Sequence, residues 1–372
     1  MAYTTIDNPS EHFQPVLFTG STSNITVDID MRPDFFWFKS RTQTYSHLLY
    51  DTSRPSDGTS MPSGDVNMYN FLTSNTTAAE DDNNADGLVQ TSTGFIVDGD
   101  GQAIGEAGQG ANNMAVWCWK ANGGTTTTND ASSTGVGSID SVYQANTTAG
   151  FSIVTYTGAA SGSTGFTIAH GLGVVPKLII VKNRDSTYPW EVFHGFERGD
   201  GARHYGVSLD DTHVQNNSDT YWNDTNPTST VFSVRESDTT NKNGDKFVAY
   251  CFSEIQGYSK FGGYTGNGNA DGPFIYTGFK PAWLLIKRVD GGTGTWLLSD
   301  NQRDPINATN KILKPNVNNV ENTGYWYVDY LSNGFKVRLT DAEINGNGHT
   351  MIYMAFAEHP FVSSEGVPTT AR

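Results

Sequence analysis

The sequence predicts an all-β protein made of three tandem, homologous β-sandwich units of the jelly-roll or lectin-like kind. Composition is the first reason: 17% of the residues are charged, 12% are aromatic, and 40 of 372 are glycine. This mixture is typical of short strands and tight turns and is poor in helix-forming residues. An internal threefold repeat is the second reason. The third is that no amphipathic helical pattern of about 10–15 residues separates the apolar segments, as a parallel α/β sheet requires.

The repeat consists of five landmarks that recur in the same order. An aromatic-Thr-Gly turn comes first, at 18–20, 156–158 and 264–266. A proline then begins an apolar strand, and six positions later stands a lysine: Lys39, Lys182 and Lys287. Eleven residues further on, a second short strand carries an apolar residue: Tyr50, Phe193 and Leu298. A phenylalanine (Phe95, Phe232, Phe335) and a closing aromatic strand (114–119, 247–252, 351–356) complete each unit.

The apolar runs predict how the strands are buried. Residues 35–38 and 178–181 are continuously apolar instead of alternating, which indicates central strands covered on both faces. Cys118 and Cys251 occupy the same place in their closing strands, where the third unit has Ala355. Equivalent positions of separate sandwiches should not meet. We therefore expect both cysteines to be small core residues and not a disulfide.

The landmarks divide the chain into three units and a linker. The first unit is 1–122, the second is 149–256, and the third is 257–372 with a short C-terminal tail. Residues 123–148 are rich in Gly, Thr and Ser, which predicts a linker. Because the second and third units join almost directly, we expect them to form the stiffer pair.

Charge and hydropathy exclude several classes of protein. The net charge of −16 argues against nucleic acid and anionic membranes as partners. The sequence has no run of 18 apolar residues and no basic, apolar start, so we expect neither membrane insertion nor a secretory signal. Two cysteines cannot form a disulfide framework.

No residue pattern predicts catalysis, so we expect a non-enzymatic protein with no catalytic residues. His170, His194 and His204 are the densest histidine group, but the other two units have no counterparts, which favours turn or surface positions. Glu254 and Glu358 match between the second and third units, and such matching favours a structural role.

Two acidic, Gly-rich loops resemble the start of a calcium loop, at 98–101 and 267–272. Both lack the glutamate that an EF-hand carries at its twelfth position, and such clusters in β proteins are usually turns. We therefore expect no metal site and no cofactor. The alternative is a calcium site in one of these loops.

Aromatic side chains in loops are the main hint of a binding function. Exposed aromatic rings stack on sugar rings, and the asparagines around them bind hydroxyl groups. The alternative is that these rings pack between units or subunits. The candidate ligand-contacting residues are Tyr188, Trp190, Tyr221, Trp222, Tyr325 and Trp326.

Several stretches resemble a known group of proteins. Residues 170–182 and 264–287, with the opening 2–10 and the end 355–361, are similar to repeated domains in virion structural proteins of tailed, especially marine, bacteriophages, often labelled tail-fibre-like. The resemblance covers nearly the whole chain and implies no catalytic residue. It implies a virion surface protein, assembled in the host cytoplasm with other virion proteins.

The resemblance leaves the position on the particle open. The chain has no heptad pattern, which a long trimeric fibre usually has. We therefore expect a short tail fibre or tail appendage that forms a homo-oligomer and contacts host surface glycan. The alternatives are a capsid or neck decoration protein that stabilises the particle and, less favoured, a sugar-degrading depolymerase.

Overall fold

The computed structural model describes residues 3–54, 65–81, 87–97, 112–160, 165–196, 201–324 and 327–370. These ranges are almost entirely antiparallel β-structure, which confirms the all-β prediction. The helices described are single turns: η1 (Pro9–Glu11), α1 (Ala131–Thr134), η3 (Ala202–His204), α2 (Asp219–Trp222), α3 (Asp238–Asn241) and α4 (Ala342–Asn345). No helix in these ranges has the length and apolar character needed to cross a bilayer.

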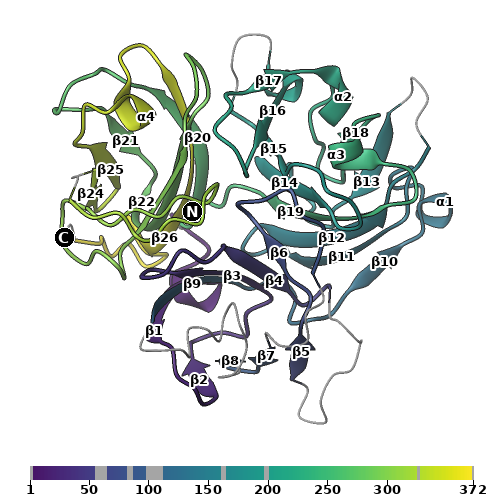
Figure 1. The fold of residues 1–372 in the computed structure, drawn as a ribbon, viewed down its shortest axis with the longest axis horizontal. Coiled ribbons are helices and arrows are strands. Elements are labelled where there is room, and N and C mark those ends of the chain that lie inside the picture. The colour runs from purple at the N-terminus through teal and green to yellow at the C-terminus, as the bar shows by residue number, and fades with distance from the viewer. Residues whose placement is uncertain are drawn as a thin grey trace.

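Three lobes lie around a common centre (Figure 1), and each has two sheets. The large sheet of the first lobe has the order β1-β9-β3-β4-β6, and its small sheet has the order β2-β8-β7-β5. The strands are β1 (Phe13–Thr19), β2 (Ile25–Asp28), β3 (Phe35–Ser40), β4 (Leu48–Asp51), β5 (Val66–Met68), β6 (Leu72–Thr73), β7 (Leu88–Thr91), β8 (Gly94–Val97) and β9 (Asn113–Trp119).

The second lobe has a large sheet of order β10-β11-β12-β19-β14-β15-β16-β17 and a small sheet, β13-β18. Its strands are β10 (Thr127–Asn129), β11 (Ser141–Asn146), β12 (Phe151–Thr157), β13 (Phe166–Ala169), β14 (Leu178–Asn183), β15 (Glu191–His194), β16 (Tyr205–Ser208), β17 (Asn216–Asn217), β18 (Val231–Val234) and β19 (Lys246–Phe252).

The third lobe pairs a large sheet of order β20-β26-β22-β23 with a small sheet of order β21-β25-β24. Its strands are β20 (Ser259–Thr265), β21 (Phe274–Tyr276), β22 (Phe279–Arg288), β23 (Trp296–Asp300), β24 (Val328–Leu331), β25 (Gly334–Val337) and β26 (Thr350–Pro360). The orders β1-β9-β3-β4, β12-β19-β14-β15 and β20-β26-β22-β23 therefore correspond strand for strand.

The cysteines lie at corresponding places in these sheets. Cys118 pairs with Phe36, Cys251 with Ile179, and Ala355 with Leu284. Both cysteines are free and fully buried, which confirms that they are small core residues.

One landmark of the repeat is out of register. Tyr50 pairs with Phe36 and Phe193 with Ile179, but the corresponding residue of the third lobe, opposite Leu284, is Ser299 and not Leu298. The prediction for Leu298 is therefore wrong by one residue. Because side chains alternate along a strand, this shift turns Leu298 to the opposite face of the sheet from its predicted counterparts.

The two sheets of each lobe face one another across an apolar core. In the first lobe the Phe95 ring of the small sheet lies 5.5 Å from Phe36. In the second lobe Phe232 lies 6.1 Å from Tyr156, and in the third Phe335 lies 5.3 Å from Tyr353. The phenylalanine landmark is thus the small sheet's contribution to the core of its lobe.

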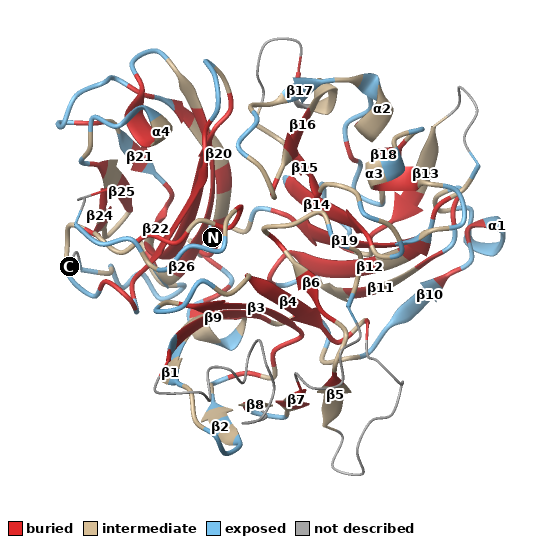
Figure 2. Ribbon diagram, viewed as in Figure 1, coloured by how far each residue is buried: buried red, intermediate tan, exposed pale blue. Residues whose placement is uncertain are grey.

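The opposite face of each large sheet packs into a core that all three lobes share, here called the central core. Phe13 of the first lobe stacks on Phe356 of the third at 4.8 Å. Trp119 lies 5.7 Å from Trp283, and Phe252 of the second lobe lies 5.9 Å from Phe356. Burial on both faces, visible in Figure 2, confirms the prediction drawn from the apolar runs.

The predicted linker is part of the second lobe, so that prediction is wrong. Strands β10 and β11 extend the large sheet along β12. The side chain of Gln144 in β11 also donates hydrogen bonds to Thr52 and Ser53 of the first lobe, each at 3.0 Å. The first and second lobes are therefore tied together as directly as the second and third.

The lysine landmarks join neighbouring lobes, and we call Lys39, Lys182 and Lys287 the interlobe lysines. All three are buried, and each ammonium donates to a carbonyl of its own loop. Each also donates to a carbonyl of a neighbouring lobe. These second acceptors are Asn318 at 3.2 Å, Thr77 at 2.9 Å and Asp211 at 3.2 Å, respectively.

These contacts run in one sense around the ring. The lysine of the first lobe donates to the third lobe, the lysine of the second lobe donates to the first, and the lysine of the third lobe donates to the second. Burial lowers the pKa of each interlobe lysine to about 8. The three interlobe lysines are therefore enclosed within the contacts between lobes.

Two of the three interfaces also carry a chain of ion pairs. At the first, Arg54 lies between Asp51 and Glu80, and Glu80 also pairs with Arg184 of the second lobe. The hydroxyl of Tyr250 donates to Asp51 at 2.7 Å. We call Asp51, Arg54, Glu80 and Arg184 the first ion-pair chain.

The interface between the third and first lobes repeats this pattern. Arg303 pairs with Asp300 at 2.6 Å and with Glu321 at 3.2 Å, and Glu321 pairs with Arg41 of the first lobe at 2.9 Å. The indole of Trp117 donates to Asp300 at 3.0 Å. Asp300, Arg303, Glu321 and Arg41 form the second ion-pair chain.

The interface between the second and third lobes differs. His194 pairs with Leu178 at the position of Asp51 and Asp300, and its Nε2 donates to the carbonyl of Tyr353 at 3.0 Å. The side chain is buried, so the predicted turn or surface position is wrong for His194. An imidazole donor here replaces the carboxylate of the other two interfaces.

Candidate functional site

The structure disperses the predicted ligand-contacting aromatics. Trp190 is completely buried in the central core, and its indole donates to the Thr73 carbonyl of the first lobe at 2.9 Å. Trp222 is buried in the core of the second lobe against Phe193, with ring centres 5.7 Å apart. The prediction that these two tryptophans contact ligand is wrong, because packing between and within lobes uses both rings.

The two tyrosines keep some exposure. The Tyr188 hydroxyl donates to Asp238 at 2.8 Å, and the Lys242 ammonium lies 5.2 Å from the ring centre. Tyr221 is half-buried beside a separate hollow in the second lobe. Tyr325 and Trp326 lie outside the described residues.

The histidine and calcium hypotheses have separate outcomes. His170 is buried in its turn, and its Nε2 donates to the Thr228 carbonyl at 3.2 Å. Burial lowers the pKa of His170 to about 4.

In the loop 267–272, Asn267 and Asn269 accept backbone hydrogen bonds within the loop. The loop 98–101 lies outside the described residues, and among those described no group of three or more His, Cys, Asp or Glu could hold a metal ion.

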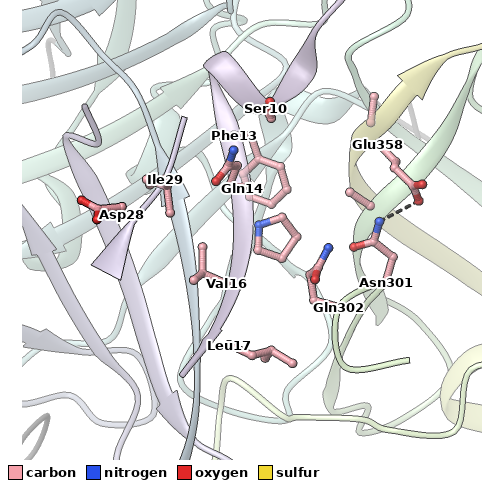
Figure 3. A pocket seen from close by; sticks show the side chains of 13 residues that line it. Ser10, Phe13, Gln14, Val16, Leu17, Asp28, Ile29, Asn301, Gln302 and Glu358 are labelled. Carbon is pink, nitrogen blue, oxygen red and sulfur yellow. Dashed lines mark hydrogen bonds between the residues drawn. The ribbon is translucent and has the colours of Figure 1, made fainter. Parts of the chain in front are cut away.

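A hollow of about 390 Å³ lies where the first and third lobes meet, and we call it the junction hollow. Figure 3 shows Gln14, Val16 and Leu17 on one side and Asn301, Gln302 and Glu358 on the other. The first side is β1, which is an edge strand of its sheet. Pro15 in this strand blocks the addition of another strand, so the edge is open to side-chain contacts.

The polar groups of the junction hollow are held in place by hydrogen bonds. Glu358 accepts from Asn301 at 2.6 Å and pairs with Lys280 at 2.9 Å. On the opposite side, Gln14 donates to Asp30 at 3.2 Å. The carboxylate that the sequence assigned to structure thus forms an ion pair and also lines a hollow.

One acceptor in this hollow has no partner. Asn301 is 6% exposed, and its Oδ1 makes no hydrogen bond within the described part of the chain. A buried polar atom without a partner is unfavourable, and a ligand donor or a water would relieve this cost. With Phe13, Pro15 and Ala282 as apolar surface, the hollow suits an uncharged ligand that carries hydroxyl groups.

Sequence reasoning missed the junction hollow because its two sides come from opposite parts of the chain, residues 10–29 and residues 282–358. The match between Glu254 and Glu358 was the available signal. The two carboxylates diverge in the structure: Glu254 is exposed and pairs with Lys260 at 2.5 Å, whereas Glu358 is partly buried at the lobe junction.

One protein family matches the chain over residues 8–360. The chain belongs to this family, which is described as a domain of unknown function, DUF7483. No curated protein and no solved structure matches the chain. The matched range spans all three lobes, so the unit that defines DUF7483 is the three-lobed body and not a single lobe.

Proposed function

We propose that the chain is a non-enzymatic structural protein of a tailed bacteriophage particle, of the short tail fibre or tail appendage type, that contacts host surface glycan. The observation that carries this proposal is the cyclic joining of three lobes by buried lysines around one core. Such a body holds the junction hollow and its outer loops at fixed positions. Fixed display of loops suits a particle surface protein that must bind without changing shape.

The three lobes are, on this proposal, tandem homologous β-sandwich repeats. The matched strand orders support this origin, as do the three pairs Phe36–Cys118, Ile179–Cys251 and Leu284–Ala355. The interlobe lysines support it further, because a lysine at the same landmark of each lobe donates to a carbonyl of a neighbouring lobe. The resemblance of residues 170–182 and 264–287 to virion proteins connects these repeats with phage particles.

The proposed partners are other virion proteins, further copies of this chain and host glycan. The junction hollow supports glycan contact, because amide and carboxylate groups border an apolar surface there. The net charge of −16 supports assembly without nucleic acid contact.

The arrangement of the lobes favours one alternative, a capsid or neck decoration protein. Three similar lobes around one centre match a threefold position on a particle, where three equivalent contacts could be made at once (Figure 1). Immunogold labelling of particles separates the two roles, because tail and head labels lie apart.

Mass spectrometry of purified particles of the encoding phage tests the proposal. We expect the chain in stoichiometric amounts, and we expect the purified protein to compete with particles for adsorption to host cells. Purified protein should leave the viscosity of host polysaccharide unchanged. Absence from the particle, or a loss of viscosity, contradicts the proposal.

A further inference from the structure

A single glutamate interrupts the apolar core of the second lobe. Glu191 pairs with Val181 in the large sheet. Leucine occupies the corresponding position in the other two lobes: Leu48 pairs with Phe38, and Leu297 pairs with Ile286. Both leucines belong to the cores of their lobes. A carboxyl group at an apolar core position breaks the rule that the other lobes follow, and such exceptions are expected at functional sites.

Glu191 is buried and is only 3% exposed. Burial, with Asp210 and Asp211 nearby, raises the pKa of Glu191 well above its usual range. A carboxyl group in its neutral form both donates and accepts hydrogen bonds.

The chain makes room for this side chain. A Cβ atom on Gly206 would lie 1.9 Å from Oε1 of Glu191 and 2.9 Å from the ring of Tyr221. A larger residue at this point of β16 would therefore displace the Glu191 carboxyl group or the Tyr221 ring. The glutamate and the tyrosine border one hollow of about 360 Å³, which we call the Glu191 hollow.

The other side chains of the Glu191 hollow are mostly polar. Asn216 donates to the hydroxyl of Tyr221 at 3.0 Å, which fixes the ring beside the opening. Asp211 accepts from Nδ1 of His213 at 2.6 Å. Ser208 and Gln215 complete the polar lining. An aromatic ring among closely spaced donors and acceptors is the arrangement that sugar rings require.

We propose that the Glu191 hollow binds an uncharged sugar unit, with a ring face on Tyr221 and hydroxyl groups on the carboxyl groups of Glu191 and Asp211. This inference rests on the proposed glycan contact and adds a second hollow and a ligand class to it. Uncharged sugars are favoured over acidic ones because Asp210 and Asp211 would repel an anion.

The experiment is titration calorimetry of the full chain with uncharged oligosaccharides of glucose, galactose and N-acetylglucosamine, and with galacturonate oligomers as acidic counterparts. We expect binding of at least one uncharged series and none of the acidic one. Glu191→Leu should weaken that binding at least tenfold, whereas Glu191→Gln, which keeps a donor and an acceptor, should stay within about threefold of the unsubstituted chain.

Two further variants keep the test decisive. Glu254→Leu is the matched control, because it makes the same change at an exposed ion pair outside the hollow, and it should bind normally. Tyr221→Ala removes the stacking ring without changing the core position, and it should also weaken binding at least tenfold. Thermal melting checks the fold of each variant.

Three results would overturn the inference: no binding of uncharged sugars, preference for the acidic series, or unchanged binding by both Glu191→Leu and Tyr221→Ala. Calorimetry uses the isolated protein and needs no particle. A chain that is missing from particles but loses sugar binding on Glu191→Leu contradicts the proposed function alone. A particle protein whose sugar binding ignores Glu191 contradicts this inference alone.

Discussion

Different polar contacts join the first lobe to the second and the second lobe to the third. Both interfaces contain an interlobe lysine that donates to a carbonyl of the neighbouring lobe. The former adds the first ion-pair chain, whereas the latter has His194 in the place of Asp51. The lysine is thus the element common to all three interfaces, and the charged chain is an addition to two.

The path of the chain does not account for this difference. The second and third lobes are joined directly, since β19 ends at Phe252 and β20 begins at Ser259. The third and first lobes have no such connection, and the second ion-pair chain lies between them. Charged contacts therefore occur both at an interface with a short connection, where β9 ends at Trp119 and β10 begins at Thr127, and at one with no connection.

The largest effect is expected from breaking an ion-pair chain at its centre. Arg54→Met should lower the free energy of unfolding by about 3–5 kcal/mol, because it leaves the buried Asp51 without its counter-charge. Urea unfolding measures this change. The control is Arg203→Met, which breaks an exposed pair with Asp224 and should cost less than about 1 kcal/mol. Equal losses for the two variants would show that the first ion-pair chain contributes no more to the free energy of unfolding than an exposed ion pair.

The interlobe lysines predict a dependence on pH that both kinds of interface share. The folded pKa of Lys287 is about 8, and the ordinary value is 10.5. Below pH 8 both states carry the proton and the burial penalty is fully present. Between pH 8 and 10.5 the folded state loses the proton first, so stability increases by up to roughly 3 kcal/mol.

Comparison with Lys287→Met isolates this contribution from other titrating groups. The advantage of the unsubstituted chain over this variant should grow between pH 7.5 and 10, as measured by urea unfolding at both pH values. Parallel profiles for the two proteins would contradict the assignment of this pH dependence to Lys287.

A smaller effect is expected at the interface that lacks an ion-pair chain. His194→Leu removes the hydrogen bond to the Tyr353 carbonyl and should lower the free energy of unfolding by about 1–2 kcal/mol. Thermal unfolding followed by circular dichroism measures the loss. A loss as large as that of Arg54→Met would remove the contrast between the two interfaces.

The smallest effect tests whether the lobes are equivalent. Cys118→Ala and Cys251→Ala should each cost about 1 kcal/mol or less, because the third lobe has Ala355 at the same register position. Urea unfolding of both variants checks this. A large loss in only one would show that the two cores are packed differently at this position.

The sequence predicted the strands and their burial well, because those depend on local apolar pattern. The prediction failed where a tertiary partner decides the outcome. Continuous apolar runs indicate cover on both faces of a sheet, but nothing in them says that the second cover is two other lobes. Trp190 illustrates this, because its local sequence is equally compatible with an exposed loop ring and with a ring buried between lobes.

The candidate site was partly accessible from the sequence. Tyr221 was predicted, and it borders the Glu191 hollow. Glu191 could have been found by aligning the repeats, since a glutamate stands where leucine is found twice. The one-residue shift at Leu298 does not remove this signal, because it places Trp296, another apolar residue, against Glu191. The junction hollow needs contacts between the two ends of the chain, which no local pattern contains.

The central core also sets the number of lobes. A lobe on its own would expose to water the apolar face of its large sheet that packs into the central core. This exposure would be unfavourable for an isolated lobe. In the three-lobed body the rings of Phe13, Trp283 and Phe356 meet in this core. In this chain, therefore, the loss of one lobe would expose the central core of the other two.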